Sequence, residues 1–206
     1  MWSGTAPLSV GVWSGRSGGN GFDARAGMTT ELLAASQAGR VRIAIGRAAD
    51  FFGAGVTESS LGERVFANAL AGKRADFLGD PERLHTYSYV PDLVTALLTL
   101  GTDERAVGEV LHLPGPETVT TRALLDLIAA ELGHPVGVRN VPKALLRALG
   151  VLNPMMRGLA EMSYEFEQDF VLDTSKYQAT FGTAVTPLAT AVTATIAWYR
   201  TRGKLS

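Results

Sequence analysis

The amino-acid sequence predicts an α/β fold, in which short apolar strands alternate with amphipathic helices along most of the chain. Two observations lead to this prediction. The 206 residues are 46% hydrophobic, which is enough apolar material to bury a core in one or two domains. In addition, runs of alternating β-branched residues recur between segments whose apolar residues repeat with the period of a helix.

The charge balance argues against several classes of partner. The chain has 19 basic and 20 acidic residues and a formal net charge of −1, so it has no overall positive field that would attract nucleic acid or an anionic membrane. No apolar run approaches the roughly 18 residues that a membrane-spanning helix needs, and the start of the chain lacks the pattern of a secretory signal. We therefore expect a cytoplasmic protein that binds neither nucleic acid nor membranes.

Metal and thiol chemistry are also not expected. The chain contains no cysteine, which excludes disulfide bonds, thiolate metal ligands and a cysteine nucleophile. Its three histidines, His85, His112 and His134, are more than twenty residues apart. They therefore cannot form the i, i+4 pair that places two imidazole ligands on one helix face.

The first 27 residues differ in composition from the rest. Seven of them are glycine, and no helical period runs through them. We therefore predict a Gly-rich irregular segment over residues 1–27 and a folded region over residues 28–206.

Two motifs lie within this segment. Gly15, Gly18 and Gly21 have the spacing of a dinucleotide-binding turn, and Ser17 stands between glycines as in the nucleophile elbow of a hydrolase. Both motifs need a buried strand before them and a helix directly after them. Residues 7–13 have only a weak strand pattern and the following residues include further glycines, so a plain loop is the preferred interpretation.

The elements of the first half follow from local signals. Gly39 ends a short amphipathic pattern as a C-cap, the next residues alternate as a strand, and Ser60 with Glu63 forms a capping box. The expected order is a helix over 28–39, a strand over 41–45, a Gly- and Ala-rich loop over 46–55, a helix over 60–72, and a short strand and turn over 77–81.

The second half continues the alternation. Pro91 suits the first turn of a helix, Thr120 or Thr121 is an N-cap, and Gly133 ends the helix that this cap begins. The expected strands cover 85–90, 109–113 and 136–141, and the expected helices cover 91–101, 121–133, 142–149, 153–170, 173–181 and 187–199.

Five segments together resemble a known family. They are residues 41–55, which include Gly-Arg-Ala-Ala-Asp-Phe-Phe-Gly-Ala-Gly, residues 77–80, residues 85–93 with Tyr-Val-Pro-Asp-Leu, residues 109–132, and residues 173–200. In this order they are similar to the C-terminal half of the NAD(P)-dependent epimerase/dehydratase family, the extended short-chain dehydrogenase/reductases.

The resemblance implies a more specific architecture and function. The fold would be an incomplete Rossmann-like parallel sheet, with late strands only, plus a small mixed α/β substrate-binding lobe. The cofactor would be NAD or NADP, and the substrate a nucleotide sugar or another small hydroxylated molecule. The reactions of the family are those of oxidoreductases, isomerases and dehydratases. Because relatives pair two helices across a dimer interface, the resemblance leaves homodimerisation open.

The resemblance also assigns site residues. Ala49 and Asp50 correspond to positions that face the cofactor, and Asp50, Phe52, His85 and Tyr87 to positions near the substrate. His85 occupies a place where relatives often carry an arginine against a substrate phosphate, and an imidazole holds a diphosphate less well than a guanidinium fork does. The aromatic side chains of Phe52 and Tyr87 are equally compatible with a place in the core.

The catalytic pair of the family is missing from this chain. None of the five tyrosines is followed by a lysine four residues later, and a tyrosine needs a nearby lysine charge to act as an acid and base near neutral pH. We therefore assign no catalytic residue and expect no activity from the chain alone. Two interpretations remain, part of an NAD(P)-dependent enzyme or a non-catalytic module that binds a small molecule or a partner.

Overall fold

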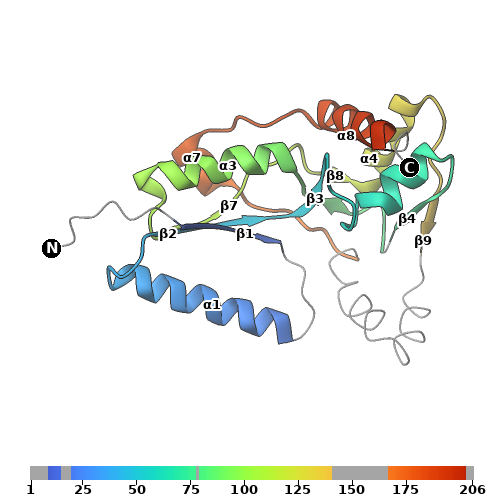
Figure 1. The fold of residues 1–206 in the computed structure, drawn as a ribbon. Coiled ribbons are helices and arrows are strands. Elements are labelled where there is room, and N and C mark those ends of the chain that lie inside the picture. Colours follow the sequence, from blue (N-terminus) through green and yellow to red (C-terminus); the bar gives the residue numbers. More distant parts are fainter. Residues whose placement is uncertain (1–8, 15–19, 78, 141–166, 203–206) are drawn as a thin grey trace.

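The computed structural model describes the backbone of residues 9–14, 20–77, 79–140 and 167–202 (Figure 1). Its centre is a parallel sheet of three strands in the order β1-β2-β7. These strands are β1 (Ser9–Ser14), β2 (Ile43–Ala48) and β7 (Val110–His112). The predicted α/β fold with a partial Rossmann-like parallel sheet is confirmed.

Helices cover both faces of this sheet. Figure 1 shows α1 (Asn20–Gln37) on one face, and α3 (Val90–Thr102) and α7 (Ser175–Phe181) on the other. This three-layer arrangement is typical of parallel sheets, because both of their faces must be shielded from water. Helix α1 runs antiparallel to the strands, as in a β-α-β unit.

The prediction of an irregular segment over residues 1–27 is wrong for Ser9–Ser14 and for the residues from Asn20 onward. Strand β1 pairs in parallel with β2 along its full length, from Ser9 opposite Ile43 to Ser14 opposite Ala48. Glycines lower both strand and helix propensity, but pairing with a neighbouring strand overrides a weak local preference. Helix α1 continues through residue 27 without a break. That the chain divides into two parts at residue 27 stays a prediction.

The prediction of a loop over residues 46–55 is wrong for its first part. Strand β2 continues to Ala48, and β3 (Asp50–Phe52) pairs in parallel with β6 (Tyr87–Tyr89). The small residues have a packing role, since a Cβ atom on Gly46 would lie only 2.9 Å from a methyl carbon of Leu113. Gly46 is therefore explained by the close approach of the Leu113 side chain to the strand, and not by a loop conformation.

Most other predicted elements are confirmed with shifts of a few residues. The described remainder comprises the π-helix η1 (Gly62–Ala67), α2 (Asn68–Leu70), β4 (Ala75–Phe77), β5 (Leu84–His85), the 3-10 helix η2 (Glu104–Ala106), β8 (Val119–Thr120), α4 (Thr121–Leu132), β9 (Val138–Asn140) and α8 (Leu188–Arg202). Strands β4 and β9 pair in parallel and β5 and β8 antiparallel. The predicted helix over 142–149 and residues 153–166 of the predicted helix over 153–170 lie outside the described residues. The end of the latter prediction is wrong, because residues 167–170 are not helical and Phe170 pairs with His85 in a β-bridge.

The caps of α4 are those that the sequence predicts. The Thr120 hydroxyl accepts a hydrogen bond from the Ala123 N–H at 3.1 Å. At the other end, Gly133 adopts a left-handed conformation with φ of 76°, which only glycine adopts without strain. Local chemistry alone therefore fixes the boundaries of this helix.

Two groups of buried side chains form the core. One lies between the three-stranded sheet and α3, and includes Ala44, Ala48, Leu93 and Leu100. The other joins η1, α4 and α8 to β3 and β6 through the side chains of Phe52, Phe66, Tyr87, Leu124, Leu125, Ile128, Val192, Ile196 and Tyr199, among others. Strands β2 and β3 link the two groups.

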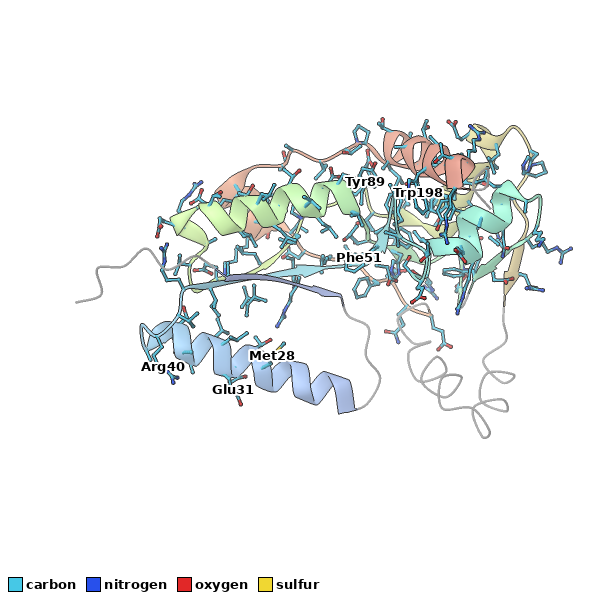
Figure 2. All side chains as sticks on the ribbon, viewed as in Figure 1. Met28, Glu31, Arg40, Phe51, Tyr89 and Trp198 are labelled. Atoms are coloured by element: carbon cyan, nitrogen blue, oxygen red, sulfur yellow. The ribbon has the colours of Figure 1, made fainter. Side chains whose placement is uncertain are left out.

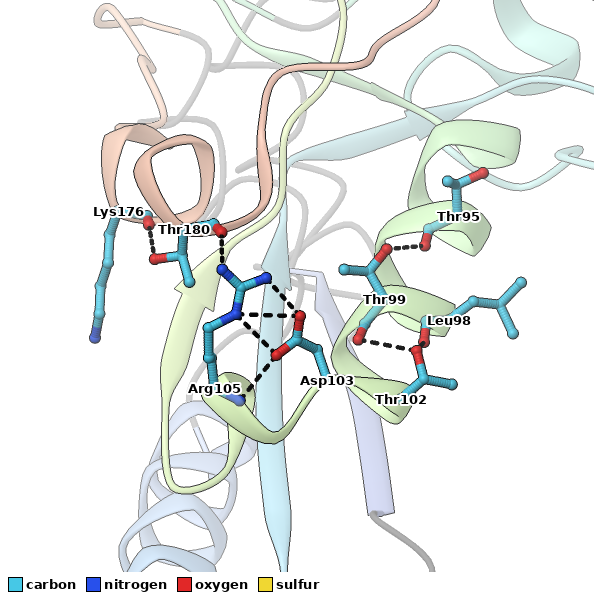
Figure 3. A network of polar contacts seen from close by, with 8 residues as sticks. All are labelled: Thr95, Leu98, Thr99, Thr102, Asp103, Arg105, Lys176 and Thr180. Atoms are coloured by element: carbon cyan, nitrogen blue, oxygen red, sulfur yellow. Dashed lines mark hydrogen bonds and ion pairs between the residues drawn. The ribbon is translucent and has the colours of Figure 1, made fainter.

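Polar contacts fix the end of α3 against α7 (Figure 3). Arg105 binds the Asp103 carboxylate, donates a hydrogen bond to the Thr180 carbonyl oxygen at 2.8 Å, and lies 5.1 Å from the centre of the Phe181 ring. Along α3, the hydroxyls of Thr95, Thr99 and Thr102 donate to carbonyl oxygens of the same helix.

None of the helices described has both the length and the apolar character that a membrane span requires.

Candidate functional site

A buried pair of a carboxyl group and an imidazole lies just beyond the carboxyl end of β2. Asp50 is the first residue of β3, and its Oδ2 atom lies 3.1 Å from Nε2 of His85, the last residue of β5. The two side chains are only 9% and 5% exposed. In parallel α/β sheets, ligands bind beyond the carboxyl ends of the strands, so this pair lies where a site is expected.

Two aromatic rings flank the imidazole of His85. The Tyr87 ring centre lies 4.6 Å from it and the Phe170 ring centre 5.0 Å. Phe170 is held by backbone pairing, because the Thr86 N–H donates to its carbonyl oxygen and its own N–H donates to the Leu84 carbonyl oxygen, both at 2.8 Å. The imidazole therefore has a fixed ring plane and a fixed carboxylate partner.

Tyr87 takes part as a neutral hydroxyl group. Its hydroxyl lies 2.7 Å from the Thr121 hydroxyl. Burial raises the pKa of Tyr87 far above that of a free tyrosine, and the nearby Asp50 charge acts in the same direction. Tyr87 therefore stays protonated at neutral pH and cannot act as a general base there.

The structure brings some of the predicted site residues together and separates others. Asp50, His85 and Tyr87 share one cluster, and Ala49 lies beside it with its N–H donating to the Ser88 hydroxyl at 3.0 Å. Phe52 is fully buried, with its ring 6.2 Å from that of Phe66 and 5.4 Å from that of Tyr89. Its packing is that of a core residue.

Several neighbours of the site were not predicted. Ser88, Thr121 and Phe170 hold the cluster through the contacts given above. The alternating pattern of residues 85–90 indicates a strand but not its partners, and Phe170 lies 85 residues further along the sequence than His85. Thr121 was recognised only as a helix cap.

Solved structures share this arrangement of elements. The chain superposes on the UDP-glucuronic acid 4-epimerase of Bacillus cereus, in complex with UDP-glucuronic acid and NAD, with a TM-score of 0.71 at 14% identity, over 95% of this chain and 62% of that chain. For an epimerase of Methanothermobacter thermautotrophicus the TM-score is 0.72 at 14% identity, over 96% and 60% of the two chains. For the dTDP-glucose 4,6-dehydratase of Bacillus anthracis in complex with NAD it is 0.68 at 15% identity, over 92% and 54%.

The fold is that of the NAD-dependent epimerases and dehydratases. The predicted resemblance is thus confirmed at the level of the fold. The chain spans between 54% and 62% of the length of the three structures named. No family model and no curated protein matches the sequence.

The epimerase/dehydratase fold changes the context of the N-terminal glycines. The strand and helix that a dinucleotide-binding turn needs are both present, because β1 ends at Ser14 and α1 begins at Asn20. The argument from a missing strand and helix is therefore corrected. Residues 15–19 themselves, which contain Gly15, Ser17 and Gly18, lie outside the described residues.

The described residues near the site offer few donors to the phosphates of a dinucleotide. The Ala49 N–H is already used by Ser88, and Asp50 is a carboxylate that would repel a phosphate. That Ala49 and Asp50 face the cofactor stays a prediction. Within the described ranges, no group of three or more histidine, aspartate or glutamate side chains could hold a metal ion.

Proposed function

We propose that the chain belongs to the NAD(P)-dependent epimerase/dehydratase family and supplies the part of its fold that binds the substrate. The observation that carries this proposal is the buried Asp50–His85 pair at the carboxyl end of the parallel sheet, within a fold shared with these enzymes. The substrate class is a nucleotide sugar or another small hydroxylated molecule.

The site is suited to recognising hydroxyl groups. A carboxylate accepts hydrogen bonds from sugar hydroxyls, and the imidazole beside it, held between two aromatic rings, adds a second polar group of fixed direction. An apolar wall with a few oriented polar groups is typical of small-molecule sites. Asp50, His85, Tyr87 and Phe52 thus remain the proposed substrate residues, with Phe52 acting from the core behind them.

We further propose that the chain does not catalyse the family's reaction alone. The sequence has no tyrosine with a lysine four residues later. Burial raises the pKa values of Tyr87, Tyr89 and Tyr199, which is opposite to the shift that a tyrosine base requires. The cofactor, NAD or NADP, would then need groups other than Ala49 and Asp50 for its phosphates.

Isothermal titration of UDP-glucose into the purified chain tests the substrate site. We expect saturable binding that His85→Gln weakens at least about tenfold, because the substitution removes the imidazole beside Asp50. His134→Gln is the matched control, since His134 is exposed and far along the sequence from the site. Equal binding by both variants would show that the nucleotide sugar binds elsewhere, and no binding by the wild type would exclude this substrate.

A second candidate function is a non-catalytic module that binds a small molecule or a partner. It is favoured by the core around Phe66 and Tyr199, which is closed by residues of this chain alone. Size-exclusion chromatography with thermal melting separates the two candidates. A monodisperse monomer that melts cooperatively favours the module, whereas a chain that self-associates or melts broadly favours part of a larger enzyme. The cytoplasmic location and a homodimer belong to the first candidate.

A further inference from the structure

Arg47 is an exposed cation on the central strand of the sheet. Five of the six residues of β2 are buried and Arg47 alone is exposed. Strand β2 lies between β1 and β7, where side chains are normally covered by helices on both faces. A charged side chain is unusual at such a position, so we asked which ligand it could bind.

The packing of β2 shows which face carries Arg47. Ala44 and Ala48 belong to the core group that contains Leu93 and Leu100 of α3. Side chains alternate along a strand, so Arg47 points to the opposite face, the one on which α1 lies (Figure 1).

His112 is the cross-strand neighbour of Arg47. The two residues are register partners in the parallel pairing of β2 with β7, so their side chains leave the sheet on the same face. The Nδ1 atom of His112 lies 2.8 Å from the Asp173 carbonyl oxygen. Because a carbonyl oxygen only accepts, Nδ1 carries a proton, and Nε2 becomes a second donor whenever the ring is positively charged.

The side chains of Arg47 and His112 both have hydrogen-bond donors that no other described residue uses. Among the described residues, the Arg47 side chain makes no hydrogen bond or ion pair, and His112 makes none through Nε2. Two acidic groups lie close to His112 and already have partners, since the Asp173 carboxylate accepts from the Ser175 N–H at 2.9 Å and Glu109 pairs with Lys176. Arg47 and Lys176 balance the charges of Asp173 and Glu109, so the local charge is positive when His112 is protonated.

We propose that Arg47 and His112 form a binding site for an oxyanion, such as the phosphate group of a small ligand. A guanidinium and an imidazole at paired positions on neighbouring parallel strands, near the carboxyl ends of these strands, provide donors at the place where α/β folds bind ligands. The site is separate from the Asp50–His85 pair and does not depend on the function proposed above.

Sulfate is a suitable probe, because its charge does not change between pH 5 and 8. We expect an NMR titration of the full chain, with sulfate replacing chloride at constant ionic strength, to give saturable shifts of the Arg47 and His112 amides. Arg47→Gln should weaken sulfate binding at least about tenfold. Arg40→Gln is the matched control, because Arg40 is exposed and lies at the end of α1 away from the carboxyl ends of β1 and β2 (Figure 2).

The pH dependence supplies a second readout. Sulfate binding should weaken as the pH rises through the range in which histidine loses its proton. The charged groups around His112 are Arg47, Asp173, Glu109 and Lys176. We expect His112→Gln to abolish this pH dependence, whereas His134→Gln should leave it unchanged.

The outcomes decide the proposal. Saturable sulfate binding that is lost in Arg47→Gln and kept in Arg40→Gln supports it. If both arginine variants lose binding equally, or if sulfate causes no saturable shift, the proposal is wrong. Should Arg47→Gln fail to fold, Arg47→Lys retains the charge without the fork, and binding weakened severalfold with an unchanged spectrum supports the proposal. Tighter binding of ribose 5-phosphate than of sulfate would assign the site to the phosphate of a larger ligand, and equal binding to the free anion.

Discussion

The contact between Asp50 and His85 joins two residues that lie 35 positions apart in the sequence. The family resemblance placed each of them near the substrate, but it did not predict that they touch. Their contact depends on the pairing of β3 with β6, which places Asp50 opposite Tyr87, and on Phe170 closing the other side of the ring. Residue identity thus indicated the site, whereas strand pairing determines its geometry.

Removing the carboxylate of this pair should be costly. We expect Asp50→Ala to lower the free energy of unfolding by about 1–3 kcal/mol, because the buried imidazole of His85 would lose its hydrogen-bond contact with the carboxyl group. Urea unfolding followed by circular dichroism measures this change. His134→Ala, at an exposed histidine, should change stability by less than about 0.5 kcal/mol. A similar small change for both variants would show that the buried pair contributes little.

Alkaline pH should destabilise the protein through its tyrosines. Burial raises the pKa of Tyr199 to about 12, and its hydroxyl donates a hydrogen bond to the Val56 carbonyl oxygen. A folded-state pKa above the unfolded value of 10.0 stabilises the fold fully below pH 10, and this stabilisation is lost as the pH rises toward 12. We expect stability to fall over this window, and to fall less steeply in Tyr199→Phe. Equal slopes for both proteins would contradict the assignment.

At the scale of single elements, the π-helix η1 depends on one close approach. A Cβ atom on Gly62 would lie 2.1 Å from the Thr57 carbonyl oxygen, which also accepts a hydrogen bond from the Glu63 N–H. The capping-box pattern of Ser60 and Glu63 predicted a helix here, but the N-cap residue is Leu61 and no side chain caps the helix. The Ser59 hydroxyl accepts from the Leu61 N–H in the turn before it. The position of the helix was predictable, and its wide first turn was not.

A pair of glycine substitutions tests this description. Gly62→Ala should lower the free energy of unfolding by about 1–3 kcal/mol, because the added methyl group has no room beside Thr57. Gly27→Ala, in α1, meets nothing within 4 Å and should leave stability unchanged or raise it by up to about 1 kcal/mol. Thermal melting of the two variants beside the wild type measures both effects, and a Gly62→Ala protein as stable as the wild type would show that the turn relaxes freely.

Strand β1 shows where local sequence information ends. Val10 and Val12 alternate with Gly11 and Trp13, a pattern too short and too rich in glycine to predict a strand by itself. The partner strand supplies the missing information, because β2 offers a continuous ladder from Ile43 to Ala48. Elements with strong caps, such as α4, could be predicted from the sequence, and elements that exist through pairing could not.

At the scale of the whole molecule, the family resemblance predicted more than the local patterns did. Apart from the strand residues within 46–55, the order of the predicted strands and helices over residues 41–133 agrees with the structure, and the likeness to solved epimerases and dehydratases confirms the fold. The three-stranded sheet, two helical layers and a second core built on α4 and α8 form a coherent frame around Asp50 and His85.

The central proposal is that this chain supplies the substrate-binding part of the epimerase/dehydratase fold and does not bind the cofactor by itself. A fluorescence titration of NADH, carried out with UDP-glucose present, tests it most directly. The proposal predicts no saturable change in NADH fluorescence at micromolar protein. Tight, saturable NADH binding would contradict it and would favour the glycine motif of Gly15 and Gly18 as the cofactor site.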